Sequence, residues 1–365
     1  MGIPEIMCGV VLTGHGGLEK LEWRDDLPVP KPGKGQVLVR VHAAAVNNTD
    51  INTRTGWYSK SVRGDTASGA DGGYGSSADA DGSWSGVPLT FPRIQGADCC
   101  GEIAAVGEGV SRSRIGERVL LRALQAPADN EEDMPIATLG SESNGAFADY
   151  TVVTGTDAIA IHSNLSDVEL ATFPCAFSTA EGMIQRVELG AERVLITGAS
   201  GGVGSAAIQL AKRRGAHVTA LTSPSKAQDL IALGADNTLG RDDAFPERSF
   251  DVVIDLVGGP RWPDLIEALK NGGRYVTAGA IAGPIVELDL RTLYLRDLTL
   301  VGCTYQPANI FTDLVRYIED GEIKPVVSDT YRLQDLRDAQ EAFLAKSFVG
   351  KIGIKVVEEL KQFSN

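Results

Sequence analysis

The residue pattern with the clearest chemistry is a glycine loop at positions 199–204, which reads ASGGVG. A glycine at 201 lets the backbone approach a pyrophosphate closely, and a glycine at 204 lets the following helix pack close to the preceding strand. The N-terminus of that helix adds free N–H groups and a positive dipole end. The pattern predicts dinucleotide binding by Ala199, Gly201, Gly202, Val203 and Gly204. Ala199 departs from the strict GxGxxG fingerprint, whose first position is glycine.

Strand-like runs alternate with helical patterns around this loop and beyond it. The runs are Val194–Thr197, Val218–Thr222, Val252–Leu256 and Tyr275–Ala278. Such alternation predicts an α/β domain with a parallel, doubly wound sheet of the Rossmann type. Before residue 150, alternating runs such as Gln36–Val46 indicate mostly β structure. The sequence therefore predicts two domains of different character.

The end of the second of these strands predicts which dinucleotide is bound. A protein that prefers NAD usually has a carboxylate there for the ribose 2′-hydroxyl, but residues 221–226 read LTSPSK and contain no acid. Ser223 and Lys226 can instead hold a 2′-phosphate through a hydroxyl and an ammonium group. We therefore expect NADP as the cofactor. The alternative for Lys226 is a solvated lysine at a helix start.

Composition excludes several classes of protein. The chain has 365 residues with a formal net charge of −14, which disfavours partners such as nucleic acid and anionic membranes. Its five cysteines show no CxxC spacing, so neither a disulfide framework nor a zinc ribbon is indicated. No run of about 18 apolar residues is present to span a bilayer. We expect a cytoplasmic protein.

A segment of different composition interrupts the β-rich region. Residues 59–90 are dominated by glycine, serine, aspartate and alanine, with few apolar side chains to offset the entropy of ordering them. The composition predicts a flexible surface insertion. Either a lid over a substrate site or plain disorder fits this prediction.

Six further segments carry a family resemblance: AAAVNNTDINTRTGWY (43–58), QGADCCGEIAAVGEGV (95–110), FPCAFSTAEG (173–182), ASGGVG (199–204), VIDLVGG (253–259) and VGKIGIKV (349–356). Together they resemble the medium-chain dehydrogenase/reductase superfamily, in its zinc-free branch of quinone oxidoreductases and enone reductases. The resemblance implies a GroES-like, mostly β catalytic domain at 1–155 and 306–365, enclosing a Rossmann domain at 156–305. It also implies a homodimer paired through residues 298–302.

The resemblance implies a site without metal. Matching the motifs places the catalytic zinc ligands of related alcohol dehydrogenases at Asn47, Ala97 and Cys175, of which only the cysteine is a zinc ligand. Reduction of a simple ketone concentrates charge on one oxygen, whereas quinones and enones delocalise it, so hydrogen bonds can replace the metal. We therefore expect an enzyme that transfers hydride from NADPH to a quinone or another small conjugated carbonyl substrate.

The family motifs also imply roles for single residues. Asn47 matches an asparagine beside the nicotinamide whose amide could bind a substrate oxygen, with a turn asparagine as the alternative. Asp50 is expected to orient its neighbours. For the coenzyme, the resemblance implies Thr179 near the nicotinamide carboxamide, Arg241 near the 2′-phosphate, Gly279 and Ala280 along the nicotinamide ribose, and Lys351 as a further contact.

Tyr58 decides between two activities. Related 2-enoyl thioester reductases carry a tyrosine after a similar pattern, here DINTRTGWY at 50–58, as a proton donor. A phenol is protonated at neutral pH and could protonate the carbon alpha to the carbonyl. A tyrosine that only lines the cleft is the alternative. Two alternatives to the quinone or enone reductase therefore stay open. One is an enoyl-CoA type reductase that uses Tyr58, and the other is a non-catalytic NADPH-binding protein.

Overall fold

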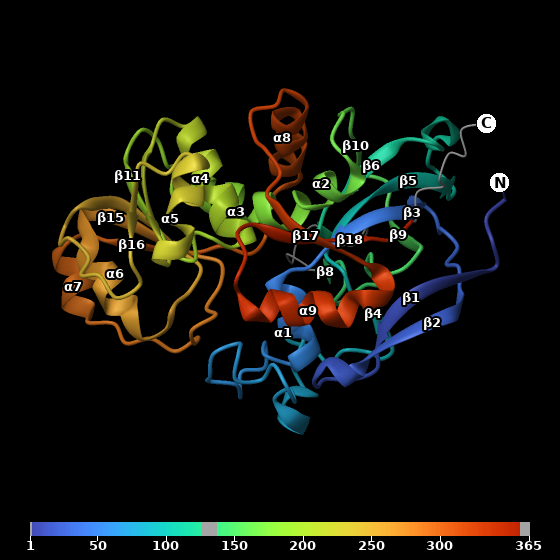
Figure 1. Cartoon of the computed structure of the whole chain (residues 1–365), viewed down its shortest axis with the longest axis horizontal. Coiled ribbons are helices and arrows are strands. Elements are labelled where there is room, and N and C mark those ends of the chain that lie inside the picture. Colours follow the sequence, from blue (N-terminus) through green and yellow to red (C-terminus); the bar gives the residue numbers. More distant parts are fainter. Residues whose placement is uncertain (1, 126–136, 358–365) are drawn as a thin grey trace.

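The computed structural model describes residues 2–125 and 137–357. The chain forms two halves that lie side by side, a β-rich half that contains the N-terminus and a nucleotide-binding half (Figure 1). The long helix α3 lies between them in this view. This arrangement confirms the predicted α/β class, with a Rossmann-type parallel sheet beside a mostly β domain.

The nucleotide-binding half is built on six parallel strands in the order β13-β12-β11-β14-β15-β16. In chain order they are β11 (Arg193–Ile196), β12 (His217–Leu221), β13 (Asn237–Leu239), β14 (Phe250–Asp255), β15 (Leu269–Thr277) and β16 (Thr299–Gly302). Chain connection reverses direction beside β11, the point at which doubly wound sheets bind their ligands. The four strands predicted from the sequence are all present, with boundaries shifted by a few residues.

The β-rich half contains a seven-stranded sheet in the order β10-β6-β5-β3-β18-β17, with β9 paired to β3. Its strands are β3 (Gln36–Ala45), β5 (Asp98–Val106), β6 (Arg118–Leu121), β9 (Tyr150–Thr154), β10 (Ala158–Ala160), β17 (Val327–Arg332) and β18 (Lys351–Lys355). A smaller sheet of β1 (Ile6–Leu12), β2 (Leu21–Pro28) and β4 (Arg93–Ile94) and the pair β7 (Leu124–Gln125) and β8 (Ala137–Thr138) complete it. Strand β18 therefore brings the chain's end back beside its beginning.

The α-helices connect the sheets and cover them. They are α1 (Asn48–Thr55), α2 (Asp167–Ala171), α3 (Pro174–Arg186), α4 (Gly202–Arg213), α5 (Ala227–Ala232), α6 (Trp262–Ala268), α7 (Leu290–Leu295), α8 (Ala308–Glu319) and α9 (Leu336–Ala345). Short 3-10 turns lie at Leu18–Lys20, Gly75–Ala78, Arg112–Arg114, Pro224–Lys226, Gly259–Arg261 and Leu333–Asp335. The helical face predicted within α4 is buried at Ala206, Ala207, Leu210 and Ala211, and Val203 is half-buried.

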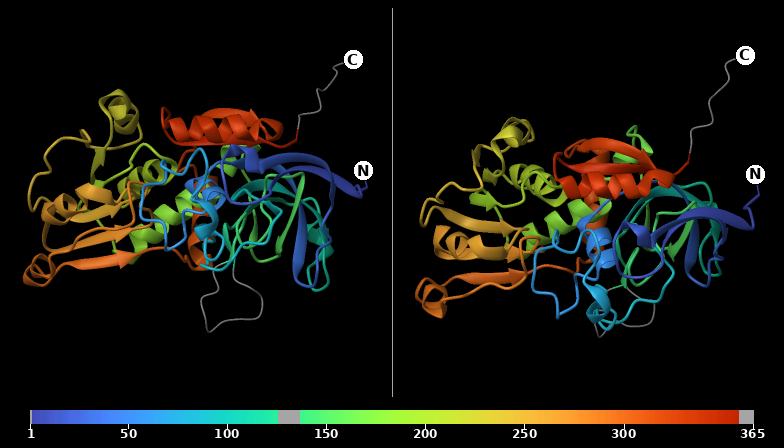
Figure 2. Two further views of the ribbon diagram at one scale, coloured as in Figure 1. Left: turned by 90° about the horizontal axis from the view of Figure 1, so that it is seen from below. Right: turned by 60° about the horizontal axis from the view of Figure 1, so that its bottom comes forward.

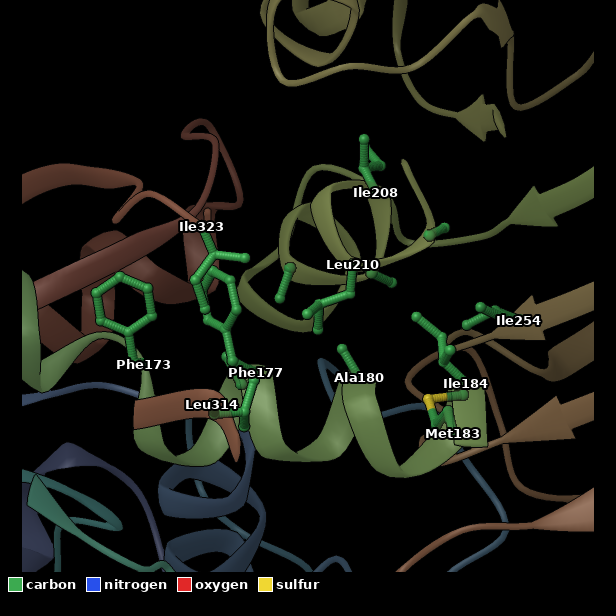
Figure 3. Close-up of a cluster of buried hydrophobic side chains, with 14 of the residues drawn as sticks. Phe173, Phe177, Ala180, Met183, Ile184, Ile208, Leu210, Ile254, Leu314 and Ile323 are labelled. Carbon is green, nitrogen blue, oxygen red and sulfur yellow. The ribbon is translucent and has the colours of Figure 1, made fainter. Parts of the chain in front are cut away.

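One apolar core joins α3, α4 and α8 (Figure 3). Phe177 and Ala180 of α3 pack in one cluster with Leu210 of α4 and Leu314 of α8. Helix α8 therefore packs against α3 and α4, and the domain boundary at residue 306 stays a prediction. Strand β10 likewise pairs with β6 of the catalytic sheet rather than with the Rossmann sheet.

The insertion at 59–90 has a defined course between the two halves, beyond α1 (Figures 1 and 2). It contains little regular structure, as its composition predicted, yet Val62, Ala78 and Ser83 are buried. The Thr66 N–H donates to the Ile281 carbonyl of the nucleotide-binding half at 3.0 Å. The insertion is therefore a bridge between the halves rather than a loop that lies only on the surface.

Candidate active site

The glycine loop has the geometry that a pyrophosphate requires. Gly201 is the N-cap of α4, so the first helical N–H groups face the loop. A Cβ at Gly204 would lie 2.3 Å from the Gly198 carbonyl oxygen and 2.5 Å from the Ala199 Cα, so only glycine lets the helix approach the strand this closely. Ala199 is fully buried beneath the loop. The loop thus fits a dinucleotide despite its departure from the strict fingerprint.

The predicted 2′-phosphate residues lie at the end of β12. Lys226 is only 8% exposed, and its Nζ donates to the carbonyl oxygen of Lys346 at 2.6 Å. It is therefore not a solvated lysine at a helix start. The hydroxyl of Ser223, the residue just before this turn, lies 3.1 Å from that of Ser225.

A third cation, Lys346, completes this corner. Burial, and then the charge of Arg241, lower the pKa of Lys226. Burial, and then the charge of Lys226, lower the pKa of Lys346 to about 8. Among the described residues, the Lys346 ammonium donates to one oxygen, the neutral Asn48 Oδ1 at 3.1 Å. Arg241 thus acts on Lys226 and Lys226 on Lys346, and no ion pair of these three residues is found among the described residues, so this corner favours an anion.

Sequence reasoning missed Lys346 because it belongs to the other half of the chain. It follows α9 and adopts a left-handed conformation with φ of 53°. Its ammonium lies over the Phe343 ring, 3.8 Å from the centroid. The only local signal was a lysine five residues before Lys351, which shows nothing of the neighbourhood of Lys226.

The predicted nicotinamide contacts lie on two elements. Thr179 is on α3, where its hydroxyl donates to the Cys175 carbonyl at 2.7 Å. Gly279 and Ala280 follow β15 at the carboxyl end of the parallel sheet. A Cβ at Gly279 would lie 3.1 Å from the Leu256 carbonyl oxygen, so the backbone passes close to the end of β14 there.

A buried polar network lies in the β-rich half, at the start of α1. The Lys351 ammonium donates to Asn47 Oδ1 at 2.5 Å and to Asp98 Oδ2 at 2.7 Å. Asn47 Nδ2 donates to the same Asp98 oxygen at 2.8 Å, and the Cys175 N–H donates to the other at 2.7 Å. The side chains of Lys351 and Asp98 are 4% and 0% exposed. Sequence reasoning named Asn47 and Lys351 but not Asp98.

Lys351 also connects this network to the glycine loop. A Cβ at Gly202 would lie 2.5 Å from the Lys351 Cδ, so the lysine side chain crosses the first turn of α4. Just before it, the Gly350 N–H donates to the Ser200 carbonyl at 2.9 Å, and Gly201 and Gly350 form a bridge between the halves. The side chain passes the coenzyme loop, while its ammonium ends at Asn47 and Asp98.

Asp50 accepts hydrogen bonds from two backbone N–H groups at the start of α1 and beside it. One of its carboxylate oxygens accepts from the Asn47 N–H at 2.8 Å, and the other accepts from the Gly96 N–H at 3.2 Å. Burial raises the pKa of Asp50 to about 7, and these backbone hydrogen bonds partly oppose the increase. The residue thereby caps α1 and fixes the backbone of Asn47.

This raised pKa predicts a pH dependence of stability. Folded Asp50 has a pKa of about 7 and the unfolded residue one of 3.8, so the folded chain binds more protons between these values. The Asp50 contribution to the free energy of unfolding is therefore greatest at low pH and is lost as the pH rises to about 7. Urea denaturation of the wild type and Asp50→Asn at about pH 5 and about pH 7.5 checks this. The wild type should lose more stability than the variant over this interval; equal losses would contradict it.

Tyr58 lies against an aromatic wall beside this network. Its ring contacts Trp84 of the insertion edge to face, with centroids 4.9 Å apart. Burial raises its pKa well above the usual value, and the charges of Cys175 and Asp50 act in the same direction. The Thr49 and Asn52 side chains oppose this increase, although the Thr49 hydroxyl and the side-chain amide oxygen of Asn52 make no hydrogen bond of good geometry. The phenol is therefore protonated and has two buried polar neighbours with spare bonding capacity.

The residues at the predicted metal positions do not fit zinc. The amide of Asn47 is already bonded to Lys351 and Asp98, Ala97 offers only a methyl group, and burial raises the pKa of the Cys175 thiol. Within residues 2–125 and 137–357, no cluster of three or more histidine, cysteine, aspartate or glutamate side chains is arranged to hold a metal ion. We derive no metal-dependent step from this site.

A Rossmann sheet whose glycine loop meets a β-rich half beside a buried polar network is the architecture of a two-domain nucleotide-dependent oxidoreductase. The GroES-like domain of alcohol dehydrogenases matches residues 33–163, and the zinc-binding dehydrogenase family matches residues 202–320. The chain belongs to the medium-chain dehydrogenase/reductase superfamily, which confirms the resemblance drawn from the sequence motifs.

Three relatives illustrate the range of the family. A solved structure of a putative alcohol dehydrogenase from Sinorhizobium meliloti is 43% identical, with a TM-score of 0.86 and coverage of 97% of each chain. Acryloyl-coenzyme A reductase of Metallosphaera sedula is 29% identical over 95% of this chain and 99% of that protein. The chloroplastic NADPH-dependent alkenal/one oxidoreductase of Arabidopsis thaliana is 26% identical over 89% of this chain and 72% of that protein.

Proposed function

We propose that this protein is an NADPH-dependent reductase of quinones or other small conjugated carbonyl compounds. The observation that carries the proposal is the presence of two polar sites, each built from residues far apart in the chain. One is the corner of Lys226, Lys346 and Arg241, which suits a 2′-phosphate. The other is the network of Asn47, Asp98 and Lys351, which provides hydrogen-bond donors in place of metal ligands.

Each part of the site then has a chemical task. Bound NADPH supplies the hydride. Gly201 and Gly204 seat the pyrophosphate at the N-terminus of α4, and Gly279 leaves room beside the nicotinamide ribose. Asp50 holds Asn47 in place. The protonated Tyr58 phenol acts as the general acid that protonates the carbon alpha to the carbonyl.

An enoyl thioester reductase of the enoyl-CoA type is the second candidate. The similarity to an acryloyl-coenzyme A reductase over nearly the whole chain favours it, as does the raised pKa of Tyr58, which keeps this phenol protonated. The candidate from another class, a non-catalytic NADPH-binding protein, has no specific contact in its favour.

One assay separates the three. NADPH absorbance is followed with a quinone, a small enone and acryloyl-CoA at matched concentrations, with NADPH fluorescence as a binding readout. The proposal predicts rapid consumption with the quinone or the enone. Consumption only with the thioester would move the assignment to the second candidate, and binding without consumption would move it to the third.

Our proposal for partners is a small-molecule substrate and a second copy of this chain. Edge strand β16 leaves one side of the Rossmann sheet unpaired, and next to it α7 exposes Leu290, Tyr294 and Leu295 by more than 60%. Pairing of two β16 edges would cover this apolar face. No helix among the described residues has the length and apolar character to cross a membrane, and cytoplasmic location stays a prediction.

Sedimentation velocity tests the dimer. The double variant Tyr294→Asp with Leu295→Asp should sediment as a monomer, because it places two charges in the proposed apolar contact. Ile115→Asp is the matched control, since Ile115 is an exposed apolar residue far from β16, at 44% exposure. A wild type that sediments as a monomer, or a double variant that remains a dimer, would refute this interface.

A further inference from the structure

The structure changes which group is available to the substrate oxygen. The sequence pointed to the Asn47 amide, but Asn47 Nδ2 donates to Asp98 Oδ2 at 2.8 Å and to the Ala45 carbonyl at 3.3 Å. Both of its N–H bonds are therefore engaged, and its oxygen accepts from Lys351. Asn47 fits the role of a positioning residue for its neighbours.

The Lys351 ammonium has one N–H more than the hydrogen bonds it makes among the described residues. An ammonium group has three N–H bonds, and among the described residues two are directed to Asn47 Oδ1 and Asp98 Oδ2. The group is 4% exposed and is held between the first turn of α4 and the start of α1. It is thus a fixed, desolvated cation beside two of the three family metal positions, Asn47 and Cys175, and the Cys175 N–H donates to the same Asp98 carboxylate.

We propose that the third N–H of Lys351 binds the carbonyl oxygen of the substrate and stabilises the negative charge that forms there, in place of a metal ion. The inference rests on the proposed reduction of a conjugated carbonyl compound. Lys351 becomes a catalytic residue rather than only the coenzyme contact that family resemblance implied. Asp98 fixes the ammonium, and its own two oxygens are taken up by Lys351, Asn47 and the Cys175 N–H.

The step balances without proton loss from the lysine. Hydride transfer from NADPH, which is oxidised to NADP, forms a C–H bond at the beta carbon of the substrate and breaks the C=C π bond. Its electron pair shifts to form an enolate, whose oxygen carries the negative charge against the ammonium. Protonation of the alpha carbon by the Tyr58 phenol restores the C=O bond, and the phenolate regains its proton from water. The substrate is reduced by two electrons, and Lys351 returns unchanged.

Substrates that differ in charge delocalisation provide the first test. Lys351→Met should lower kcat for a simple enone by about 100-fold, in the range for loss of one oxyanion donor, and less for a quinone. Lys351→Arg keeps a cation at this position, so it should retain much of the wild-type kcat for the enone. The dissociation constant of NADPH should stay within about threefold of the wild type in both variants. Lys351→Met leaves the buried Asp98 carboxylate without its cation, which could prevent folding. In that case the double variant Lys351→Met with Asp98→Asn replaces the single variant, because it removes that carboxylate charge as well.

A binding probe gives a readout that needs no turnover. Ionised 4-nitrophenol absorbs visible light and carries a phenolate oxygen that resembles an enolate. In complex with the wild type or Lys351→Arg and NADP, its apparent pKa should fall by about one unit, and in complex with the double variant it should not. A uniform loss of rate for both substrates with weakened NADPH binding, and no change in the probe, would overturn the proposal and leave Lys351 as a coenzyme contact. Absence of NADPH consumption by the wild type would instead refute the proposed function.

Discussion

Replacing Lys226 by alanine should weaken NADPH binding at least about tenfold and leave NADH binding nearly unchanged, because charge-assisted hydrogen bonds to a phosphate contribute about 1.5 to 3 kcal/mol. Lys346→Ala should weaken NADPH binding to a similar extent, because the Lys346 ammonium lies close enough to that of Lys226 for its pKa to be lowered by it. The double variant should lose less NADPH affinity than the product of the two single losses. Either single substitution already removes the repulsion between the two ammonium groups, so this change is not counted twice in the double variant. Fluorescence titration with each coenzyme measures these affinities.

The control for these variants is Lys31→Ala, which removes the same charge from an exposed lysine distant in sequence from both halves of the corner. It should leave both affinities unchanged. Equal affinity of the wild type for NADH and NADPH, or equal weakening of both by Lys226→Ala, would show that this corner does not bind a 2′-phosphate.

Tyr58→Phe should lower kcat for a small enone by about 100-fold, within the usual contribution of a positioned general acid. A quinone should lose far less, because its product oxygens take protons directly from water. The fold should persist, since the ring keeps its edge-to-face contact with Trp84. Steady-state kinetics with both substrates at saturating NADPH measure the difference.

Tyr150→Phe removes a hydroxyl from a tyrosine on β9, outside the cleft network, and should change neither rate. A loss below about threefold for the enone in Tyr58→Phe, or equal losses for both substrates, would show that Tyr58 only lines the cleft.

The Rossmann half could be predicted because its signals are local. The glycine loop at 199–204 and the apolar face of α4 lie within one strand-helix unit, so period and spacing were sufficient. The network of Asn47, Asp98 and Lys351 joins residues up to 304 positions apart in the chain, and no local pattern marks Asp98 as a partner. Contacts between residues far apart in the chain are therefore the part of the site that sequence spacing does not predict.

The insertion shows the same limit of composition. Glycine and serine predicted mobility, but small residues also permit close packing. A Cβ at Gly56 would lie 2.3 Å from the Ala78 Cβ, so the small side chain of the insertion packs directly on the end of α1. Trp84 adds an aromatic contact to Tyr58 that composition alone did not suggest.

The most direct test of the account is the fate of a labelled hydride. NADPH deuterated at C4, prepared as each of the two epimers, is incubated with the protein and a small enone, and the product is analysed by NMR and mass spectrometry. The account predicts that one epimer transfers its deuterium to the beta carbon and yields a saturated ketone. Deuterium on the carbonyl carbon of an allylic alcohol would contradict it, because the site would then reduce the carbonyl itself rather than the conjugated double bond.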